Sequence, residues 1–216
     1  MDPLHFCISV VPIAAYMLLI GWINLRRRPF LTTGARDLAT LAIAISGLMV
    51  CGPMELFLPE AMAALIGGWV WLPLLVLYAL IVTLVLLLIR PRLVVYNITS
   101  ERLRPILKEV INGLDDQARW AGDSVSLPSL GVNLAIDAHP GIRNVTLAAV
   151  GTDQELNGWV KLRMRLAAAL SENRQPANLQ GISFLVLSSV LAIAVVYSLF
   201  TGRQEIAQAF RQMMRL

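Results

Sequence analysis

The chain has 216 residues, of which 57% are hydrophobic and only 15% are charged, and its formal net charge at pH 7 is +4. Soluble domains carry about 25% charged residues, so this composition excludes an ordinary soluble globule. A mean hydropathy of +0.68 indicates a membrane protein.

Four apolar stretches are long enough to cross a bilayer, which takes about 20 mostly apolar residues in a helix. They lie at 5–25, 38–58, 69–89 and 181–200. The charges around the first stretch do not favour a cleaved signal peptide, because Asp2 precedes it and three arginines follow it. We therefore expect a three-helix transmembrane region over residues 1–90 and a fourth transmembrane helix over 181–201.

Glu55 is an acidic residue inside the second apolar stretch. Acidic side chains are costly within a bilayer, and they are therefore often functional there. Glu55 lies within one turn of the predicted outer end of its helix, and Pro53 can let it reach water. Two hypotheses stay open: Glu55 handles an ion or a proton, or it is a packed or snorkelling residue at the membrane boundary.

Residues 91–180 differ from the rest of the chain, because they hold nine of the fourteen acidic residues. Residues 93–97 predict a strand directly after the third transmembrane helix. Apolar residues then recur at helical spacing up to Leu114, and Pro105 suits the first turn of a helix that begins at about residue 104. This change of periodicity predicts a domain that folds in water.

The second half of this domain predicts further strands and a last helix. A hairpin turns at 122–124, and alternating apolar residues predict strands at 132–138 and 145–149. A capping box at 152–155 predicts a helix over about 153–171. Its apolar residues available for burial are Leu156, Trp159, Val160, Leu166, Ala167 and Leu170. The order β-α-β-β-β-β-α indicates a small α+β domain, an antiparallel sheet with helices on one face.

Residue types that commonly carry catalysis or bind metals are scattered. His5 and His139 have no second histidine or cysteine at ligand spacing, and Cys7 and Cys51 fall at different predicted membrane depths, which does not favour a disulfide. The acidic pair at 115–116 is expected to end a helix and to be solvated. Residues 90–180 have a net charge of only +2, which does not favour nucleic-acid binding. We therefore expect no catalytic residues, no metal, no cofactor and no nucleic-acid partner.

A basic cluster lies near the end of the predicted domain, close to the fourth transmembrane helix. Its members are Lys161, Arg163, Arg165 and Arg174. Cations near an inner leaflet attract anionic headgroups, with a contribution of about 1 kcal/mol for each charge. The cluster is therefore a candidate contact with inner-leaflet lipid, and a solvated helix face is the alternative.

Basic residues also predict the orientation of the chain. If the N-terminus lies outside, 15 of the 18 lysines and arginines fall on the cytoplasmic side. We therefore expect residues 91–180 to face the cytoplasm of a bacterial inner membrane and both chain ends to lie outside. The tail, 202–216, opposes this bias with three arginines, but its apolar residues repeat at helical spacing. This pattern predicts an amphipathic interfacial helix, with a frayed tail as the alternative.

Two functions fit this organisation. Small residues recur at close-packing spacing in the second and fourth predicted helices, which suits helix packing within the chain or in a homo-oligomer. The first hypothesis is a non-enzymatic accessory or scaffold subunit whose cytoplasmic domain binds a protein partner. The alternative is a small transporter or channel component that uses the intramembrane acid Glu55.

Overall fold

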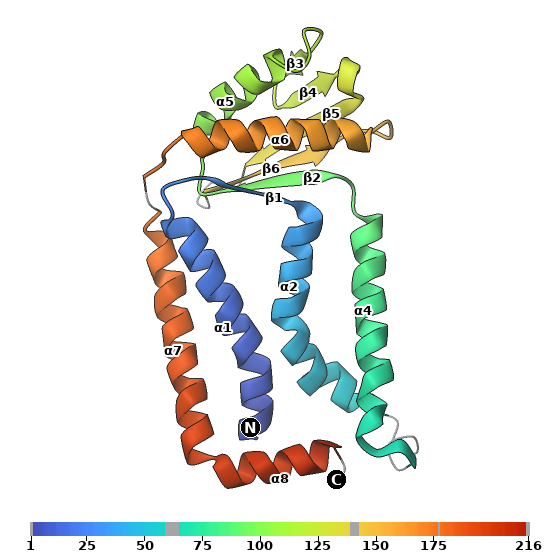
Figure 1. Cartoon of the computed structure of the whole chain (residues 1–216), viewed down its shortest axis with the longest axis vertical. Helices are drawn as coiled ribbons and strands as arrows, with labels where there is room; N and C mark the ends of the chain where they lie inside the picture. The colour runs from blue at the N-terminus through green and yellow to red at the C-terminus, as the bar shows by residue number, and fades with distance from the viewer. Residues whose placement is uncertain (1, 59–64, 139–142, 177, 215–216) are drawn as a thin grey trace. The chain divides into compact units, whose positions relative to one another are not determined.

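The computed structural model describes residues 2–58, 65–138, 143–176 and 178–214 (Figure 1). Glu60, His139 and Arg215 lie outside the described residues. The chain forms two compact units. The first comprises Met1–Gly21, Leu38–Leu88 and Ile182–Leu216, and the second comprises Trp22–Asp37 and Ile89–Gly181. The second unit thus takes in the segment Trp22–Asp37, which sequence analysis assigned to the three-helix region.

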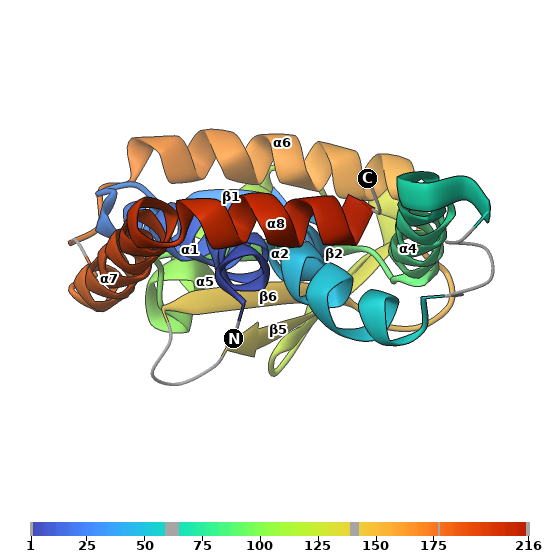
Figure 2. The ribbon, with the colours of Figure 1, turned by 90° about the horizontal axis from the view of Figure 1, so that it is seen from below.

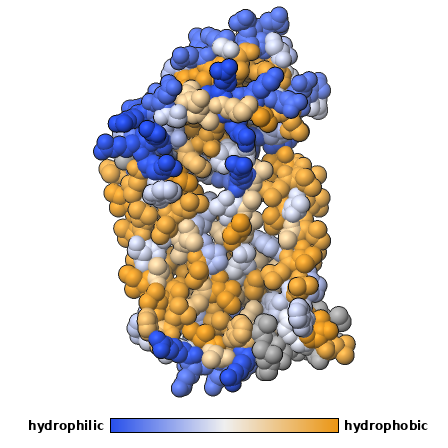
Figure 3. All heavy atoms as spheres, in the orientation of Figure 1, coloured by the Kyte–Doolittle hydropathy of each residue, from blue (hydrophilic) through white to orange (hydrophobic). Residues whose placement is uncertain are grey.

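Among the described residues, four helices are long and apolar enough to cross a membrane, as predicted. They are α1 (Pro3–Leu25), α2 (Gly34–Met49) with the π-helical turn η1 (Val50–Met54), the 3-10 turn η2 (Gly67–Val70) with α4 (Trp71–Leu88), and α7 (Gln180–Thr201). The second begins and ends four residues earlier than the predicted 38–58. The faces of α4 and α7 that Figure 3 shows are mostly apolar, and Leu87 on α4 is 78% exposed. Such side chains suit contact with lipid tails.

Polar groups and small residues join the helices of the first unit. Ser188 Oγ on α7 donates to the Ala14 carbonyl on α1 at 2.8 Å, and Tyr78 Oη on α4 donates to the Ala42 carbonyl on α2 at 2.6 Å. A side chain at Gly47 on α2 would collide with the backbone of α1 at Ile8. Small residues and interhelical hydrogen bonds are typical of helix packing in lipid.

The tail forms the helix α8 (Arg203–Met214), which confirms the helix predicted from its periodicity. Figures 1 and 2 show α8 running from the end of α7 toward α4. Trp71 Nε1 at the start of α4 donates to the Met213 carbonyl at 3.0 Å, and Ala209 is buried. These contacts join the C-terminal end of α8 to the start of α4.

The second unit contains a six-stranded antiparallel sheet. Its strands are β1 (Phe30–Thr33), β2 (Arg92–Tyr96), β3 (Arg119–Ala121), β4 (Ser124–Leu127), β5 (Val132–Ala138) and β6 (Asn144–Ala149), in the order β1-β2-β6-β5-β4-β3. Two helices accompany them, α5 (Ser100–Asn112) and α6 (Leu156–Glu172), and a 3-10 turn, η3 (Pro128–Leu130), joins β4 to β5. The predicted element order from β2 to α6 is confirmed. The strand β1 was not predicted.

The core of this unit lies between one face of the sheet and the helices α5 and α6, as Figure 1 shows for α6. On β5, Val132, Leu134 and Ile136 point into the core, while the residues between them are less buried. The helices contribute buried residues at helical spacing: Leu103, Leu107 and Ile111 from α5, and Trp159, Leu162, Leu166 and Leu170 from α6. The predicted arrangement of helices on one face of the sheet is confirmed.

Two predictions about helix starts were wrong. α5 begins at Ser100 instead of 104, because the Thr99 carbonyl already accepts the N–H groups of Arg102 and Leu103, and Pro105 therefore lies inside the helix. The capping box does not form, and α6 begins at Leu156. Gln154 instead accepts a hydrogen bond from Trp159 Nε1 at 2.9 Å and donates to the Asn133 and Val150 carbonyls.

Asp115 is buried, in contrast to the predicted solvated acid. Its carboxylate accepts hydrogen bonds from Ser129 N and Ser129 Oγ, both at 2.8 Å, and from Gln117 N at 2.9 Å. Burial acts to raise the pKa of Asp115, but the hydrogen bonds from Ser129 and Gln117 outweigh it and hold the pKa below its ordinary value. The ionised side chain thus joins the end of α5 to η3.

Candidate functional site

Glu55 is the first residue after the second candidate span, which ends at Met54. The preceding turn, η1, is π-helical and contains Pro53, which has no N–H to donate. The Glu55 N–H donates to the Gly52 carbonyl, and its side chain is 44% exposed. π-Helical turns within α-helices are frequent at functional sites, because they change the direction of the side chains around them.

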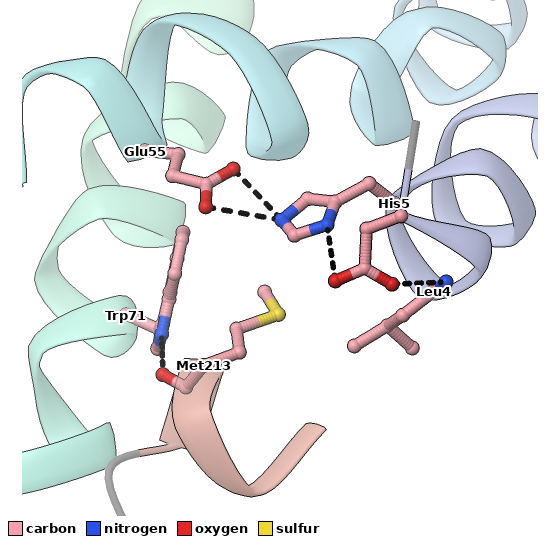
Figure 4. A network of polar contacts seen from close by, with 6 residues as sticks. Leu4, His5, Glu55, Trp71 and Met213 are labelled. Carbon is pink, nitrogen blue, oxygen red and sulfur yellow. Dashed lines mark hydrogen bonds and ion pairs between the residues drawn. The ribbon is translucent and has the colours of Figure 1, made fainter. Parts of the chain in front are cut away.

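His5 on α1 is the partner of Glu55 (Figure 4). Its Nε2 lies 3.0 Å from Glu55 Oε1 and 2.9 Å from Oε2, and its Nδ1 lies 3.5 Å from Asp2 Oδ2. Asp2 is itself fixed, because its Oδ1 accepts the Leu4 N–H at 3.1 Å. The imidazole therefore lies between two carboxylates, one from the residue just before α1 and one from the residue just after η1.

The polar triad Asp2, His5 and Glu55 borders a hollow of about 390 Å³ in the first unit. Ser9, Leu48, Cys51 and Gly52 complete its lining. The two ring nitrogens of His5 face different carboxylates, so the three side chains do not converge on one point. In the described part of the chain, no group of three or more His, Cys, Asp and Glu side chains is placed to hold a metal ion. Cys7 and Cys51 are both free.

The chemistry that this triad allows is proton and cation binding. A protonated His5 donates from both nitrogens, whereas neutral His5 has only one donor. Two carboxyl groups and one imidazole border the hollow, so it suits a proton or a cationic group better than an anion. Sequence analysis singled out Glu55 but not its partners. The predicted topology could have indicated these partners, because it places the start of the first helix and the end of the second helix on the same side of the membrane.

Three of the four predicted basic residues lie on α6, and the fourth lies beyond its end. Lys161 and Arg165 are exposed on the same side of α6, Arg163 is half-buried toward its other side, and Arg174 is exposed beyond the end of the helix. Positions four residues apart lie on one helix face, which is why Lys161 and Arg165 stay together.

Between these cations, α6 exposes an apolar stripe, two of whose residues, Leu156 and Val160, were predicted to be available for burial. The α6 stripe consists of Leu156, Val160 and Met164, which recur every four residues and are 70%, 44% and 57% exposed. Ala167 is also exposed. The stripe lies outside because the buried face of α6 is already filled by Trp159, Leu162, Leu166 and Leu170. An exposed apolar helix face in a folded domain marks an interaction surface more often than isolated exposed residues do.

No protein-family model, curated protein or solved structure matches this chain. Two surfaces of the described residues therefore carry the functional argument, each within its own unit. The first is the Asp2–His5–Glu55 triad, and the second is the α6 stripe with its flanking cations.

Proposed function

We propose that the protein is a non-enzymatic accessory or scaffold subunit of a bacterial inner membrane. The four apolar helices anchor the chain in the bilayer, and the second unit faces the cytoplasm and binds a protein partner there. The exposed α6 stripe is the observation that carries this proposal. The orientation rests on the distribution of basic residues, as argued from the sequence.

The α6 stripe has the spacing by which helices dock into apolar grooves. Leu156, Val160 and Met164 present one continuous ridge along two turns, the pattern of anchors in helix-in-groove recognition. Full burial of an aliphatic side chain contributes about 1.5–3 kcal/mol, and these three are already partly buried, so covering their exposed parts supplies a gross stabilisation of only roughly 3–5 kcal/mol. Association costs at least about 4 kcal/mol, and a partner held by this stripe alone therefore binds weakly and reversibly.

The charges beside the stripe indicate the kind of partner. Lys161 and Arg165 lie along one side of it and Arg163 along the other. Cations at the rim favour encounter with an acidic surface and add specificity more than affinity. The partner is accordingly a protein that offers an apolar groove with acidic edges, either a different subunit or a second copy of this chain. Anionic lipid offers the same charge, and it is the competing ligand for these cations.

Photocrosslinking in native membranes separates these ligands. A photoreactive amino acid in place of Met164 is expected to give a protein adduct, and the Leu156→Asp change is expected to reduce that adduct strongly. The matched control is the same amino acid in place of Lys108, an exposed residue of α5. Adducts that contain only lipid, or equal protein adducts from both positions, would refute a protein partner at the stripe.

A second function is favoured by the triad in the first unit. Asp2, His5 and Glu55 meet beside a hollow of about 390 Å³, and this geometry suits a small transporter or channel component that binds a proton or cation at Glu55. Flux measured in proteoliposomes tests it, with Glu55→Gln as the variant and Glu205→Gln on α8 as the control. Flux that depends on Glu55 but not on Glu205 would favour transport over the scaffold function.

A further inference from the structure

A second hollow lies in the other unit, beside the first turn of α5. Its volume is about 210 Å³, several times the roughly 30 Å³ that one water molecule occupies in the liquid. Arg102, Arg143, Thr99, Asn97 and Gln175 are among the residues that line it. The lining is predominantly polar and includes two guanidinium groups.

The two guanidinium groups are positioned by contacts with one loop. Arg102 Nη1 donates to Gln175 Oε1 at 2.7 Å, and Arg143 Nη1 donates to the Pro176 carbonyl at 3.2 Å. Gln175 is buried, and its backbone N–H donates to the Arg27 carbonyl at 2.7 Å. A guanidinium carries five N–H donors, so each arginine keeps donors beyond these contacts. The backbone at Arg143 is held as well, because its carbonyl accepts the Ile98 N–H at 2.9 Å.

The N-terminus of α5 adds to the positive potential at this hollow. α5 has 13 residues, and the side chain of its N-cap residue, Thr99, makes no capping hydrogen bond. The first N–H groups of a helix point out of its end, and together with the helix dipole they favour an anion there. Glu101 also lines the hollow and opposes an anion, but its side chain is exposed to solvent.

Asn97 also lines the hollow. Its backbone adopts a left-handed conformation with φ 61°, and the residue is only 1% exposed. Asn97 Nδ2 donates to the Arg26 carbonyl at 2.5 Å, but Oδ1 has no hydrogen-bond partner within the described residues. A buried acceptor without a donor is destabilising, and proteins rarely leave one unsatisfied. This oxygen is buried within the protein, so the contacts with a ligand come from the two arginines and the start of α5.

We infer that this hollow, which we call the α5 anion site, binds a phosphate group, either of a soluble phosphomonoester or of a phospholipid headgroup. Arg102 and Arg143 hold the phosphate oxygens, and the first N–H groups of α5 and the Thr99 hydroxyl complete the site. The site is separate from the α6 stripe and does not depend on the proposed partner.

Calorimetric titration of the full chain in a maltoside detergent and a phosphate-free buffer tests this site. The probes are glycerol 3-phosphate and, in a second arm, dihexanoyl-phosphatidylglycerol with dihexanoyl-phosphatidylcholine as its control. Arg102→Gln and Arg143→Gln are each expected to weaken binding by about tenfold or more, because hydrogen bonds to charged groups are the strong ones. Glu101→Gln is expected to strengthen it, and Arg119→Gln on β3, an exposed arginine outside the site, is expected to leave it unchanged.

The pattern of results identifies the source of the phosphate. Binding of glycerol 3-phosphate that depends on both arginines supports a soluble ligand. Binding of the phosphatidylglycerol alone, with the same dependence, supports a lipid headgroup. Absence of both, or binding that Arg119→Gln weakens as much as Arg143→Gln does, would overturn the site. The variant Arg143→Lys, which keeps the charge, controls for loss of binding through misfolding. Its circular dichroism must match that of the unaltered protein. Its affinity for the probe must lie between those of the unaltered protein and Arg143→Gln.

Discussion

Replacement of Leu107 by alanine tests the core of the second unit. Leu107 is completely buried on the inner face of α5, in the same cluster as Leu162 and Leu166 of α6. The change removes three carbon atoms at about 0.8 kcal/mol each and leaves a cavity, and buried Leu→Ala changes cost about 2.7–5 kcal/mol in total. Leu156→Ala is the matched control, because Leu156 is 70% exposed on α6. The control is expected to change stability by less than about 0.5 kcal/mol.

Hydrogen exchange of the full chain in detergent measures how much each change destabilises the second unit. Each 1.4 kcal/mol corresponds to about a factor of ten, so Leu107→Ala should speed exchange of the α5 and β5 amides by about a hundredfold to a few thousandfold. The amides of α7, in the other unit, should be unaffected. Equal acceleration by Leu107→Ala and Leu156→Ala would refute the core assigned here, because it would place both leucines in the same environment.

Four further changes follow from the same contacts. The pKa of Asp115 lies below its ordinary value, so the ionised side chain stabilises the fold above about pH 4, the ordinary aspartate pKa. This stabilisation falls as the pH drops toward the folded-state pKa. Asp115→Asn should therefore remove this pH dependence from urea unfolding measured between pH 3 and 7. Glu55→Gln should change thermal stability by no more than about 1 kcal/mol, because the pair with His5 is partly exposed, and a larger loss would contradict that exposure. The fragment 92–176 should be soluble and show mixed α and β circular dichroism, and a random-coil spectrum would contradict an autonomous domain. The fragment should also self-associate more than the full chain does, because it lacks β1 and the edge of β2 is then unpaired. In a cysteine-free background, a cysteine at Ser126 should resist an impermeant maleimide in intact cells and one at Gln204 should react, and the reverse result would invert the orientation.

The sequence predicted the elements whose periodicity is set by a single buried face. α5 and β5 each place apolar residues at their own period, because each packs only one face against the core. For α6 the sequence predicted the helix but not which of its residues are buried. This helix carries one buried and one exposed apolar face, and composition alone does not show which face meets the sheet. Leu156 and Val160 were therefore assigned to the core, and they lie outside it.

Long-range contacts account for what the sequence did not show. β1 has only four residues and no alternating pattern, and it becomes a strand because Phe30–Thr33 pair with Leu93–Tyr96. Asp115 is buried because Ser129, fourteen residues later, supplies two of its three hydrogen bonds. Glu55 was recognised as an intramembrane acid from its position, but its pairing with His5 spans fifty residues. Local patterns carry no information about such partners.

A single cysteine at Met164, in a background without Cys7 and Cys51, gives the most direct test of a cytoplasmic partner surface on α6. The account predicts that a membrane-impermeant maleimide does not label it in intact cells. In inside-out native vesicles it should be labelled much more slowly than in the purified protein, because the partner covers the α6 stripe, while a cysteine at Lys108 should react equally in both preparations. Labelling in intact cells would place the second unit outside the cytoplasm. Equal labelling of the Met164 position in native vesicles and in the purified protein would show that nothing covers the stripe, and it would contradict the proposed function.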